Sequence, residues 1–206
     1  MKNPWKNISL SDYENHMSSN DVKQLQALND VMKVQLNEYS VEIVMVLGIA
    51  GGNGLDYVNE NKIKKIYGID INSNYLYECK KRYKKLGNIL QCICTDLINK
   101  NIDLPIADML IANLIVEYIG YENFIRIIKI VSPQYISCVL QENKGESFIS
   151  QSPYMNIFRE LNSVHHFIDD SELIKLLENN GYILICKSNY ELPNQKKLIQ
   201  LDFKIT

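Results

Sequence analysis

Short apolar runs of strand length alternate along the chain with longer segments in which apolar residues recur every three or four positions. The most apolar of these runs covers residues 43–47, reads IVMVL, and leads directly into a glycine-rich segment, GIAGGNG, at 48–54. Runs rich in β-branched residues and bounded by turn-forming residues are typical of strands. The pattern predicts seven strands, at 43–47, 65–70, 89–94, 107–112, 135–140, 182–188 and 198–203.

Helical spacing is clearest after Asn20 or Asp21, either of which can cap the N-terminus of a helix. Apolar residues then recur at intervals of three and four and form one stripe, made of Val22, Leu25, Leu28, Met32 and Leu36. Further helices are predicted at 54–61, 73–86 and 121–131, and from Asp169 or Asp170 to Gly181. Residues 1–19 and 141–168 show no regular period, and we expect them to be irregular.

Strands that alternate with helices favour an α/β fold with a doubly wound, mostly parallel sheet between two helical layers. The last two strands differ, because the segment around 193–195 that joins them is too short for a crossover helix. These two strands must therefore pair antiparallel. The sequence thus predicts a three-layer sandwich around a seven-stranded, mostly parallel sheet with an antiparallel C-terminal strand. One domain is expected over 41–206, with residues 1–40 packed on it.

Composition and charge narrow the class of protein. The 206 residues carry a formal net charge of −2, so no basic field is available to collect nucleic acid. No apolar run approaches the roughly 20 residues that cross a bilayer, and residues 1–16 lack the apolar core of a secretory signal. The five cysteines form no CxxC pair and are expected to be free thiols in a reducing compartment. We therefore expect a cytoplasmic protein without a membrane or nucleic-acid partner.

The glycine-rich segment 48–54 follows the first predicted strand, where glycines let the main chain turn tightly and come close to a ligand. Asp70 ends the second predicted strand, about 20 residues beyond this turn. An acid at that place can accept hydrogen bonds from both hydroxyls of a ribose. The two features together predict a nucleotide-type binding corner.

The ends of the third and fourth predicted strands extend this corner. Asp96 can accept a hydrogen bond from an adenine amino group, with the apolar Ile71 and Leu97 on the two sides of the ring. The fourth strand runs into Asn113. Ligands of doubly wound sheets bind beyond the carboxyl ends of the strands, so we expect these residues to share one site.

The order of these motifs resembles that of the class I S-adenosylmethionine (SAM)-dependent methyltransferases, of the small-molecule, methyltransferase type 11/25-like group. The resemblance spans residues 43–203 and implies a Rossmann-like methyltransferase fold, SAM as the cofactor and S-adenosylhomocysteine (SAH) as its product. It implies that residues 1–40 form a helical lid. It also implies a cofactor site made of Gly48, Ala50, Gly52, Asn53, Asp70, Ile71, Asp96, Leu97, Asn113 and Leu114.

Two positions depart from the family pattern. The middle glycine of the usual triplet is Ala50, and Val46 stands where the family usually has an acid, two residues before the first glycine. The missing acid removes a negative group that normally orients the cofactor's ammonium. We expect Asn53, or a residue of the N-terminal segment, to take over that contact.

The implied reaction is an in-line transfer of the SAM methyl group to a nucleophile, in which positioning supplies much of the acceleration. A base is needed only where the acceptor carries a proton at the reacting atom. The candidate bases are Glu117, His165 and His166. Each also fits a structural role, as an outward residue of its helix for Glu117 and as a solvated side chain for the histidines.

Contacts with the acceptor are expected from the lid and from the irregular segment 141–168, which would form a second wall. Within the lid, Tyr13, His16 and Met17 are candidates for contact with SAM or the acceptor, although simple surface packing explains them equally well. The further candidates for acceptor contact are Tyr118 and Tyr154.

The acceptor class is narrowed by what the motifs lack. Residues 113–116 read NLIV and have no prolines, unlike the N/D-P-P-Y/F motif of enzymes that methylate nucleobase amino groups or a glutamine amide. The Pro-Cys pair used by cytosine-C5 enzymes is also missing from the sequence. Together with the near-neutral charge, this favours a small-molecule acceptor over nucleic acid, and a protein side chain stays open.

Two other functions stay open at this point. Val46 in place of the acid is compatible with a protein that binds SAM without catalysis. An NAD-dependent oxidoreductase also uses a glycine turn and an acid, although residues 48–53 fit its G-x-G-x-x-G pattern poorly and an antiparallel C-terminal strand is foreign to its fold. Three histidines and no cysteine pair argue against a metal site. The sequence leaves the identity of the acceptor and the oligomeric state open.

Overall fold

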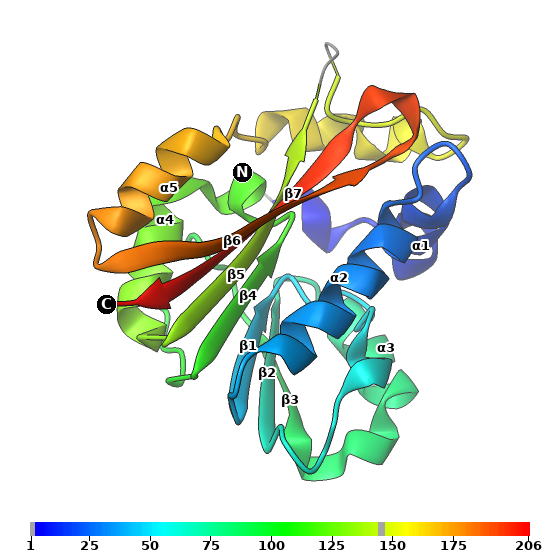
Figure 1. Ribbon diagram of the computed structural model, residues 1–206. Helices are drawn as coiled ribbons and strands as arrows, with labels where there is room; N and C mark the ends of the chain where they lie inside the picture. The colour runs from blue at the N-terminus through cyan, green and yellow to red at the C-terminus, as the bar shows by residue number, and fades with distance from the viewer. Residues whose placement is uncertain (1–2, 144–146) are drawn as a thin grey trace.

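The computed structural model describes residues 3–143 and 147–206 and has the predicted fold class (Figure 1). Its strands are β1 (Ile43–Leu47), β2 (Lys65–Asp70), β3 (Leu90–Cys94), β4 (Met109–Asn113), β5 (Tyr135–Glu142), β6 (Tyr182–Glu191) and β7 (Lys197–Ile205). They form one sheet in the order β3-β2-β1-β4-β5-β7-β6. The first five strands are parallel, and β7 runs antiparallel to both β5 and β6. The reversed strand that the short 193–195 connection requires is therefore confirmed as β7.

Helices lie on both faces of this sheet (Figure 1). They are α1 (Leu10–Ser18), α2 (Gln24–Glu38), α3 (Ser73–Arg82), α4 (Val116–Val131) and α5 (Asp170–Glu178). Because successive strand residues point to opposite faces, β1 contributes to both layers of the core. Val44 and Val46 share a core cluster with residues of α2 and α3. Met45 and Leu47 share another with residues of α4 and α5, which completes the three-layer sandwich.

The helix predicted at 54–61 is wrong. Only a three-residue 3₁₀ turn, Leu55–Tyr57, follows the glycine-rich segment. Gly54, at φ +86°, redirects the chain into this turn. Further on, Asn59 Oδ1 accepts the Asn61 N–H at 3.0 Å, and such side-chain bonds compete with the main-chain bonds of a helix. The glycine corner is therefore not followed by the N-terminus of an α-helix.

Two helix starts differ from the predicted ones. The N-terminal residue of α2 is Gln24 rather than a residue next to Asn20, because Lys23 before it adopts a left-handed φ of +51°. The start of α4 is at Val116, five residues before the predicted one. Gly120 has φ +73° and ψ 167° and interrupts the helical geometry there, so the predicted start marks the continuous part of the helix.

The segment 1–19, expected to be irregular, contains α1 and a 3₁₀ turn at Pro4–Lys6. Ser9 caps α1 by accepting the Asp12 N–H at 3.1 Å. The helix is only nine residues long and presents few apolar residues, which explains why periodicity did not reveal it.

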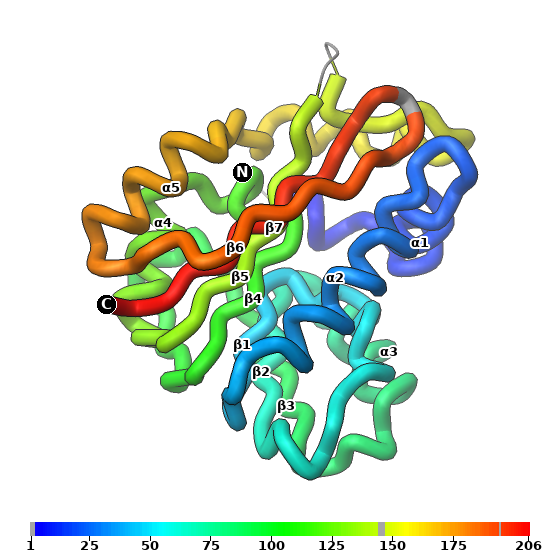
Figure 2. Tube along the Cα trace, viewed as in Figure 1, coloured from blue at the N-terminus to red at the C-terminus, as the bar shows by residue number. Residues whose placement is uncertain are grey.

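The segment 147–168 also contains local structure, a 3₁₀ helix at Met155–Ser163. It lies beside the N-terminal segment beyond the carboxyl ends of the strands (Figure 2). Ile8 from the N-terminal segment packs with Phe158 and Leu161 in one small core cluster. Residues 144–146 of the expected second wall, and residues 1–2 of the expected lid, lie outside the described residues.

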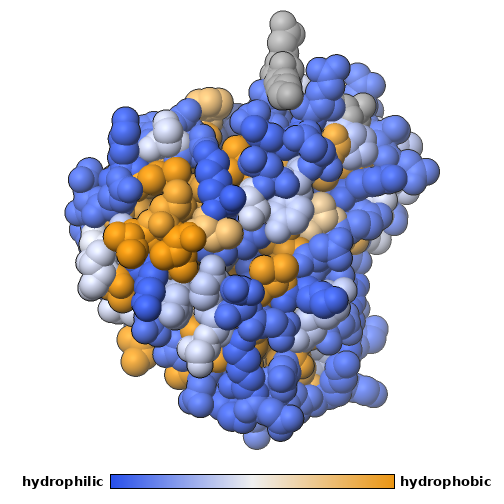
Figure 3. Space-filling model, viewed as in Figure 1, coloured by the Kyte–Doolittle hydropathy of each residue, from blue (hydrophilic) through white to orange (hydrophobic). Residues whose placement is uncertain are grey.

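The face shown in Figure 3 is mostly polar, with an apolar patch where α5 and the ends of β6 and β7 lie. Exposed large apolar residues of these strands include Ile183, Ile185 and Ile205. In the part of the chain that the structure describes, no helix has the length and apolar character needed to span a bilayer.

Candidate functional site

The glycine-rich segment forms a tight corner at the carboxyl end of β1. Gly48 adopts φ +67°, and its N–H donates to Ile69 O of β2 at 2.8 Å. A Cβ on Gly48 would lie 3.2 Å from Ile115 Cδ1, so a side chain there would crowd the segment after β4. Ala50, which replaces the middle glycine, also has a positive φ of +46°. The main chain of this corner is therefore exposed to the space in front of the sheet.

Asp70 ties the end of β2 to this corner. Its Oδ2 accepts the Ala50 N–H at 2.9 Å, and its Oδ1 accepts the Asn72 N–H at 2.9 Å. The side chain is 8% exposed. Burial raises the pKa of Asp70, and the main-chain N–H bonds oppose that rise. Each carboxylate oxygen still has a lone pair that can accept a further hydrogen bond.

The N-terminal segment is pinned across the same strand end. Asn72 Nδ2 donates to Trp5 O at 2.9 Å and to Ile8 O at 3.2 Å. Trp5 then makes edge-to-face contacts with Tyr13 of α1, at 5.9 Å between ring centroids, and with Tyr118 of α4, at 5.0 Å. The residues before α1 therefore cover the carboxyl end of β2 like a roof.

Under this roof lies a first cavity of about 680 Å³, including its open mouth. Apart from Gly52 and Asn53, every residue expected to bind a cofactor lines it. These residues are Gly48, Ala50, Asp70, Ile71, Asp96, Leu97, Asn113 and Leu114. The structure therefore brings these residues from four strand ends together around one space.

Asp96 and Asn113 differ in how free their side chains are. Asp96 Oδ1 accepts the Ile98 N–H at 3.2 Å in a local turn, and the side chain is half-buried. The Asn113 amide exchanges two hydrogen bonds of 2.9 Å with the Gln35 side chain of α2. Asn113 is thus held against the sheet, and Leu114, at φ +54°, turns the chain beside the cavity.

A second cavity of about 580 Å³ adjoins the first. Trp5, Tyr13, Leu114 and Tyr118 line both, so they form a common wall. The rest of the second cavity comes from α1, α2, α4, β5 and the segment 147–168. These remaining residues are His16, Met17, Gln24, Glu117, Gln141, Phe148, Ile149, Phe158, Leu161 and His165.

Glu117 is the one carboxylate among the described residues that line the second cavity. It is 5% exposed. Its Oε1 accepts the Gln141 N–H at 3.0 Å, whereas its Oε2 has no partner among the described residues. Burial raises the pKa of Glu117 to about 7, and the hydrogen bond from Gln141 opposes the rise. An acid with a pKa near neutrality can take up and release a proton.

The two candidate histidines, His165 and His166, lie in different environments. His165 lines the second cavity and stacks on Phe148, with ring centroids 3.7 Å apart. Burial lowers its pKa. His166 is exposed and lines neither cavity, because its N–H is bonded to Glu117 O at 2.6 Å and its ring lies over Gly120. Of the two, the structure brings only His165 to the site.

Among the lid candidates, Tyr13 lines both cavities, and His16 and Met17 line the second. His16 Nδ1 lies 2.7 Å from Ser152 Oγ, and burial lowers the pKa of the ring to about 4. Tyr154 lines neither cavity and instead packs against the small cluster around Phe158. The structure therefore does not bring Tyr154 to the site.

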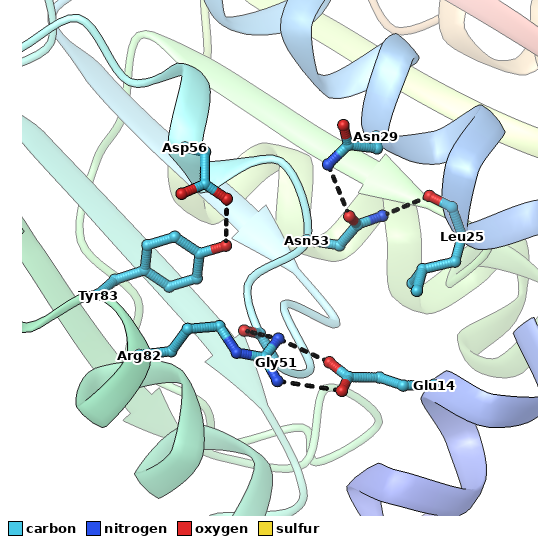
Figure 4. Close-up of polar contacts among 8 residues, drawn as sticks. All are labelled: Glu14, Leu25, Asn29, Gly51, Asn53, Asp56, Arg82 and Tyr83. Atoms are coloured by element: carbon cyan, nitrogen blue, oxygen red, sulfur yellow. Dashed lines mark hydrogen bonds and ion pairs between the residues drawn. The ribbon is translucent and has the colours of Figure 1, made fainter. Parts of the chain in front are cut away.

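A third cavity of about 520 Å³ lies between the glycine corner and the helices α1 and α2. It shares Tyr13, Gly48, Ala50 and Asn113 with the first cavity and contains Val46, the residue in place of the expected acid. Asn53 lines it too, but both ends of its amide are bonded to α2 (Figure 4). Nδ2 donates to Leu25 O at 2.8 Å, and Oδ1 accepts from the Asn29 side chain at 2.9 Å.

The acid that lines this third cavity is Glu14 of α1. Its carboxylate accepts two hydrogen bonds from Arg82 of α3, at 2.7 and 3.0 Å. Arg82 also donates to Gly51 O at 3.1 Å, so the three residues form a clasp over the glycine corner (Figure 4). Neither Glu14 nor Arg82 is among the site residues predicted from the sequence, although Glu14 lies between the lid candidates Tyr13 and His16.

Gly52 packs away from the cavities. A Cβ there would lie 2.7 Å from the Tyr83 ring and 2.8 Å from Cys79 Sγ, both of α3 or its end. Tyr83 in turn donates to Asp56 Oδ2 at 2.9 Å and holds the turn after the corner (Figure 4). Gly52 therefore permits the close approach of α3 to the corner.

Three buried polar atoms around these cavities have no partner among the described residues: Trp5 Nε1, Tyr75 Oη and Glu117 Oε2. Trp5 lines both cavities, Tyr75 the first and Glu117 the second. Unpaired buried polar groups are costly, and native proteins rarely retain them without a ligand, ion or water as partner. Their clustering points to ligand binding. No group of three or more potential metal-ligating side chains occurs within residues 3–143 and 147–206.

Comparison of the sequence with known protein families and with curated protein sequences finds no match. The structure is similar to the N-methyltransferase NodS from Bradyrhizobium japonicum WM9 in complex with SAH. The TM-score is 0.66 at 11% sequence identity, over 95% of this chain and 97% of that chain.

The structure is also similar to magnesium protoporphyrin IX methyltransferase, ChlM, from Synechocystis PCC 6803 with bound SAM. Here the TM-score is 0.67 at 10% identity, over 98% of this chain and 93% of that chain. At such identities the likeness establishes the fold. The chain has the Rossmann-like fold of the class I SAM-dependent methyltransferases, as its motif order indicated.

Proposed function

We propose that the protein is a SAM-dependent methyltransferase that transfers a methyl group to a small molecule. The observation that carries this proposal is the pair of adjoining cavities with a common wall at the carboxyl end of the sheet. One contains the two strand-end acids and the glycine corner, and the other contains a buried carboxylate. This arrangement supports a cofactor in the first cavity and an acceptor in the second.

The residues of the first cavity fit SAM. Asp70 keeps lone pairs for the ribose hydroxyls, and Asp96 is free to accept from the adenine amino group beside Leu97. The unpaired donors Trp5 Nε1 and Tyr75 Oη would find acceptors on such a polar ligand. When bound, SAM would supply a methyl group that its sulfonium makes electrophilic.

Glu14 is proposed to take the role of the acid missing at Val46. It lines the third cavity, next to the glycine corner, and carries a negative charge that Asn53 lacks. Each of its oxygens accepts one hydrogen bond from Arg82 and keeps a lone pair for a further donor. The cofactor's ammonium would then be held by the lid helix rather than by β1. Such a contact would link cofactor binding to the position of α1 and supports a lid role for residues 1–40.

Glu117 is the best supported of the three candidate bases. Its side chain lines the proposed acceptor cavity, and its pKa of about 7 suits proton uptake at neutral pH. His165 lies in the same cavity, but burial lowers its pKa and disfavours the protonated ring that uptake would produce. Trp5, Tyr118 and the roof of the cavity would exclude water from the reacting atoms.

The lining of the second cavity supports a small acceptor, because it combines apolar and aromatic side chains with few polar groups, as small-molecule sites do. The lining includes no lysine or arginine within the described residues, whereas phosphate backbones are bound mainly by such side chains. Nucleic acid is therefore disfavoured as the acceptor.

The structure also bears on the oxidoreductase alternative. Dinucleotide sites place the pyrophosphate at the N-terminus of the helix that follows the glycine turn. Here the turn Leu55–Tyr57 stands in place of that helix, so the corner lacks the α-helix N-terminus that binds a pyrophosphate in such sites. A protein that binds SAM without methyl transfer remains the second candidate, and Val46 is the observation that favours it.

Isothermal titration calorimetry with SAH, SAM and NAD tests the cofactor. We expect SAH and SAM to bind and NAD to give no heat of binding. Binding of NAD alone would overturn the proposal. Incubation with methyl-labelled SAM and pools of metabolites or proteins then separates an enzyme from a SAM-binding protein. Label in a small molecule supports the proposal, and tight SAM binding without transfer to either pool would favour the second candidate.

A further inference from the structure

The second cavity has one carboxylate and no cationic side chain among the described residues that line it. Glu117 keeps one buried oxygen, Oε2, without a partner among those residues, while its other oxygen is bonded to the Gln141 N–H. A buried acceptor without a donor costs about 1–3 kcal/mol, and more when it is charged. The cavity therefore favours a ligand that brings a donor or a positive charge to this oxygen.

Four of the ionisable groups around Glu117 stay uncharged near neutral pH, whereas Lys196, near His16 but outside the described lining of the cavity, has a pKa of about 8. Burial lowers the pKa of His16 on α1 to about 4 and also lowers that of His165. Burial raises the pKa of Tyr118, the next residue on α4, and that of Cys138 on β5. Among the described residues that line the cavity, the carboxylate of Glu117 is thus the one charge that a ligand would meet directly.

Aromatic rings form much of the remaining wall. Trp5 and Tyr118 meet edge to face at 5.0 Å between centroids, and Phe148 stacks on His165 at 3.7 Å. Phe158 closes the side toward the 3₁₀ helix. Aromatic faces attract a desolvated cation by roughly 0.5–2 kcal/mol and also bury an apolar ligand body.

We propose that the acceptor is a hydrophobic primary or secondary amine that enters the second cavity as its ammonium ion and pairs with Glu117 Oε2. The amine class deepens the proposed function and rests on it. An apolar or aromatic body would lie against the rings, and the ammonium would supply the donor that Oε2 lacks.

An ammonium has no lone pair and cannot attack a methyl group, so its proton must leave first. The proton moves from the nitrogen to Glu117 Oε2, which leaves a neutral amine and a neutral carboxylic acid. The nitrogen lone pair then forms the new C–N bond, and the carbon–sulfur bond breaks with its electron pair remaining on sulfur. The products are the N-methylated ammonium and SAH, and the acid returns its proton to solvent after release.

The other common acceptor classes fit the cavity less well. A carboxylate or phosphate group would face Glu117 without a cation among the lining residues to neutralise it. A neutral alcohol could donate to Oε2 but would gain neither the ion pair nor the attraction of the rings for a cation. An amine uses both features of the cavity.

Isothermal titration calorimetry on the SAH-loaded protein at pH 7.5 tests the inference. The probes are an amine, an alcohol and an acid with the same phenyl body: 2-phenylethylamine, 2-phenylethanol and phenylacetate. A second series has the same three end groups on a naphthalene body. The three probes of each series differ mainly in the charge of one end. In at least one series we expect the amine to bind at least tenfold more tightly than the alcohol, and the acid to bind most weakly. Equal binding of amine and alcohol, preference for the acid, or no binding of either amine overturns the inference.

The matched variants are Glu117→Gln and Glu122→Gln. The first keeps a side-chain oxygen for the Gln141 N–H and replaces the charged Oε2 with a neutral NH₂ group, from which an alcohol oxygen can still accept a hydrogen bond. Glu122 is a more exposed residue of the same helix that lines neither cavity. We expect Glu117→Gln to weaken amine binding at least tenfold and to leave alcohol binding within twofold. Glu122→Gln should bind all probes as the wild type does. Unchanged amine binding by Glu117→Gln would contradict the pairing.

The pH dependence of binding gives a further readout that needs no turnover. Between pH 6 and 7.5 the ammonium stays charged while Glu117 ionises, so amine affinity should rise severalfold and alcohol affinity should not. Lys196, which lies near His16, has a pKa lowered by burial to about 8, and burial raises the pKa of Tyr13. If amine affinity still rises with pH in Glu117→Gln, the rise belongs to the loss of charge at Lys196, and this result would count against the inference.

SAH binding to the same preparations distinguishes a failure of the proposed function from a failure of the proposed amine class. If SAH fails to bind, the proposed function itself fails. If SAH binds and amines show no preference, only the amine class is wrong. Mass spectrometry of the preferred amine after incubation with SAM should then show the gain of one methyl group.

Discussion

Asp70 Oδ2 accepts the Ala50 N–H at 2.9 Å and thereby couples the end of β2 to the glycine-rich segment after β1. Ala50 adopts φ +46°, a left-handed conformation that costs a non-glycine residue roughly 1–2 kcal/mol. The bond helps to hold the corner in this conformation. One carboxylate thus shapes the cofactor corner and is also the proposed acceptor for the ribose hydroxyls.

Two substitutions of Asp70 separate these roles. Asp70→Ala leaves the N–H groups of Ala50 and Asn72 without acceptors, so we expect the free energy of unfolding to fall by roughly 2–4 kcal/mol. Asp70→Asn keeps one acceptor oxygen and should lose less stability. It should still weaken SAH binding at least tenfold, because its NH₂ group cannot accept from a ribose hydroxyl. Urea unfolding and calorimetry measure the two effects.

Asp96→Asn is the control for stability, because among the described residues the Asp96 side chain accepts one hydrogen bond, from the Ile98 N–H in an exposed turn. It should weaken SAH binding and leave the free energy of unfolding within about 0.5 kcal/mol of the wild type. A folded Asp70→Asn protein that binds SAH as tightly as the wild type would show that the cofactor site is misplaced.

Substitution by alanine should have a local effect at Gly51 and a global effect at Gly54. A Cβ on Gly51 would lie 2.4 Å from Glu14 Oε1, the mobile end of a side chain, whereas one on Gly54 would lie 2.4 Å from Met32 Cβ. Gly54 also has φ +86°. We expect Gly51→Ala to open the clasp and speed amide hydrogen exchange in α1 without loss of global stability. Gly54→Ala should lower the free energy of unfolding by about 2 kcal/mol or more.

Denaturant unfolding and hydrogen exchange by mass spectrometry distinguish these outcomes. The clasp is partly exposed, and such ion pairs contribute little to stability, which is why a local effect is expected from Gly51→Ala. Unchanged exchange in α1 would show that the contacts with Glu14 do not hold the lid in place.

The sequence predicted the sheet well because each strand is a short apolar run whose pattern depends on its own residues. It also placed Asp70 and Asp96 at one edge, since parallel strands bring their carboxyl ends together. The helix predicted after the glycines was wrong, because local bonds of Asn59 and the conformation of Gly54 decide that stretch. Periodicity does not report such bonds.

The parts of the site that the sequence did not reveal come from contacts between distant segments. Trp5 reaches the first cavity only because Asn72, 67 residues away in the chain, binds its carbonyl oxygen. Glu14 reaches the glycine corner through Arg82 of α3. Conversely, His166 fits the pattern of a catalytic residue but is exposed, because its main chain is bonded to Glu117 O. A single sequence carries no signal for these pairings.

Glu14→Gln tests whether the lid supplies the acid that Val46 cannot. Glutamine keeps the shape of the side chain but loses the charge, so we expect SAH to bind about tenfold more weakly. An SAH analogue without the amino group should bind wild type and variant alike, because it has no ammonium to pair. Asp12→Asn, an acid on the same helix that lines none of the three cavities, is the matched control. Equal loss for SAH and the analogue would indicate a disturbed lid instead of a lost ion pair.

Glu117 should make the fold less stable as its carboxyl ionises. Its pKa is about 7 in the folded protein against an ordinary value of 4.5. Below pH 4.5 the group is protonated in both states, and between pH 4.5 and 7 the folded state holds a proton that the unfolded state has released. The free energy of unfolding therefore falls as the pH rises through this window, by about 3 kcal/mol in total, and the deficit persists above pH 7.

Urea unfolding of the wild type and Glu117→Gln at pH 4.5, 6 and 8 measures this contribution. Other titrating groups cancel in the difference between the two proteins, as does the constant cost of fitting the glutamine. The difference should shift in favour of Glu117→Gln by about 3 kcal/mol from pH 4.5 to 8. Glu122→Gln, which changes a more exposed acid of the same helix, is the matched control for the loss of a carboxylate from α4. A pH-independent difference for Glu117→Gln would mean that its carboxyl titrates normally, which would remove the physical basis for its role as a base at neutral pH.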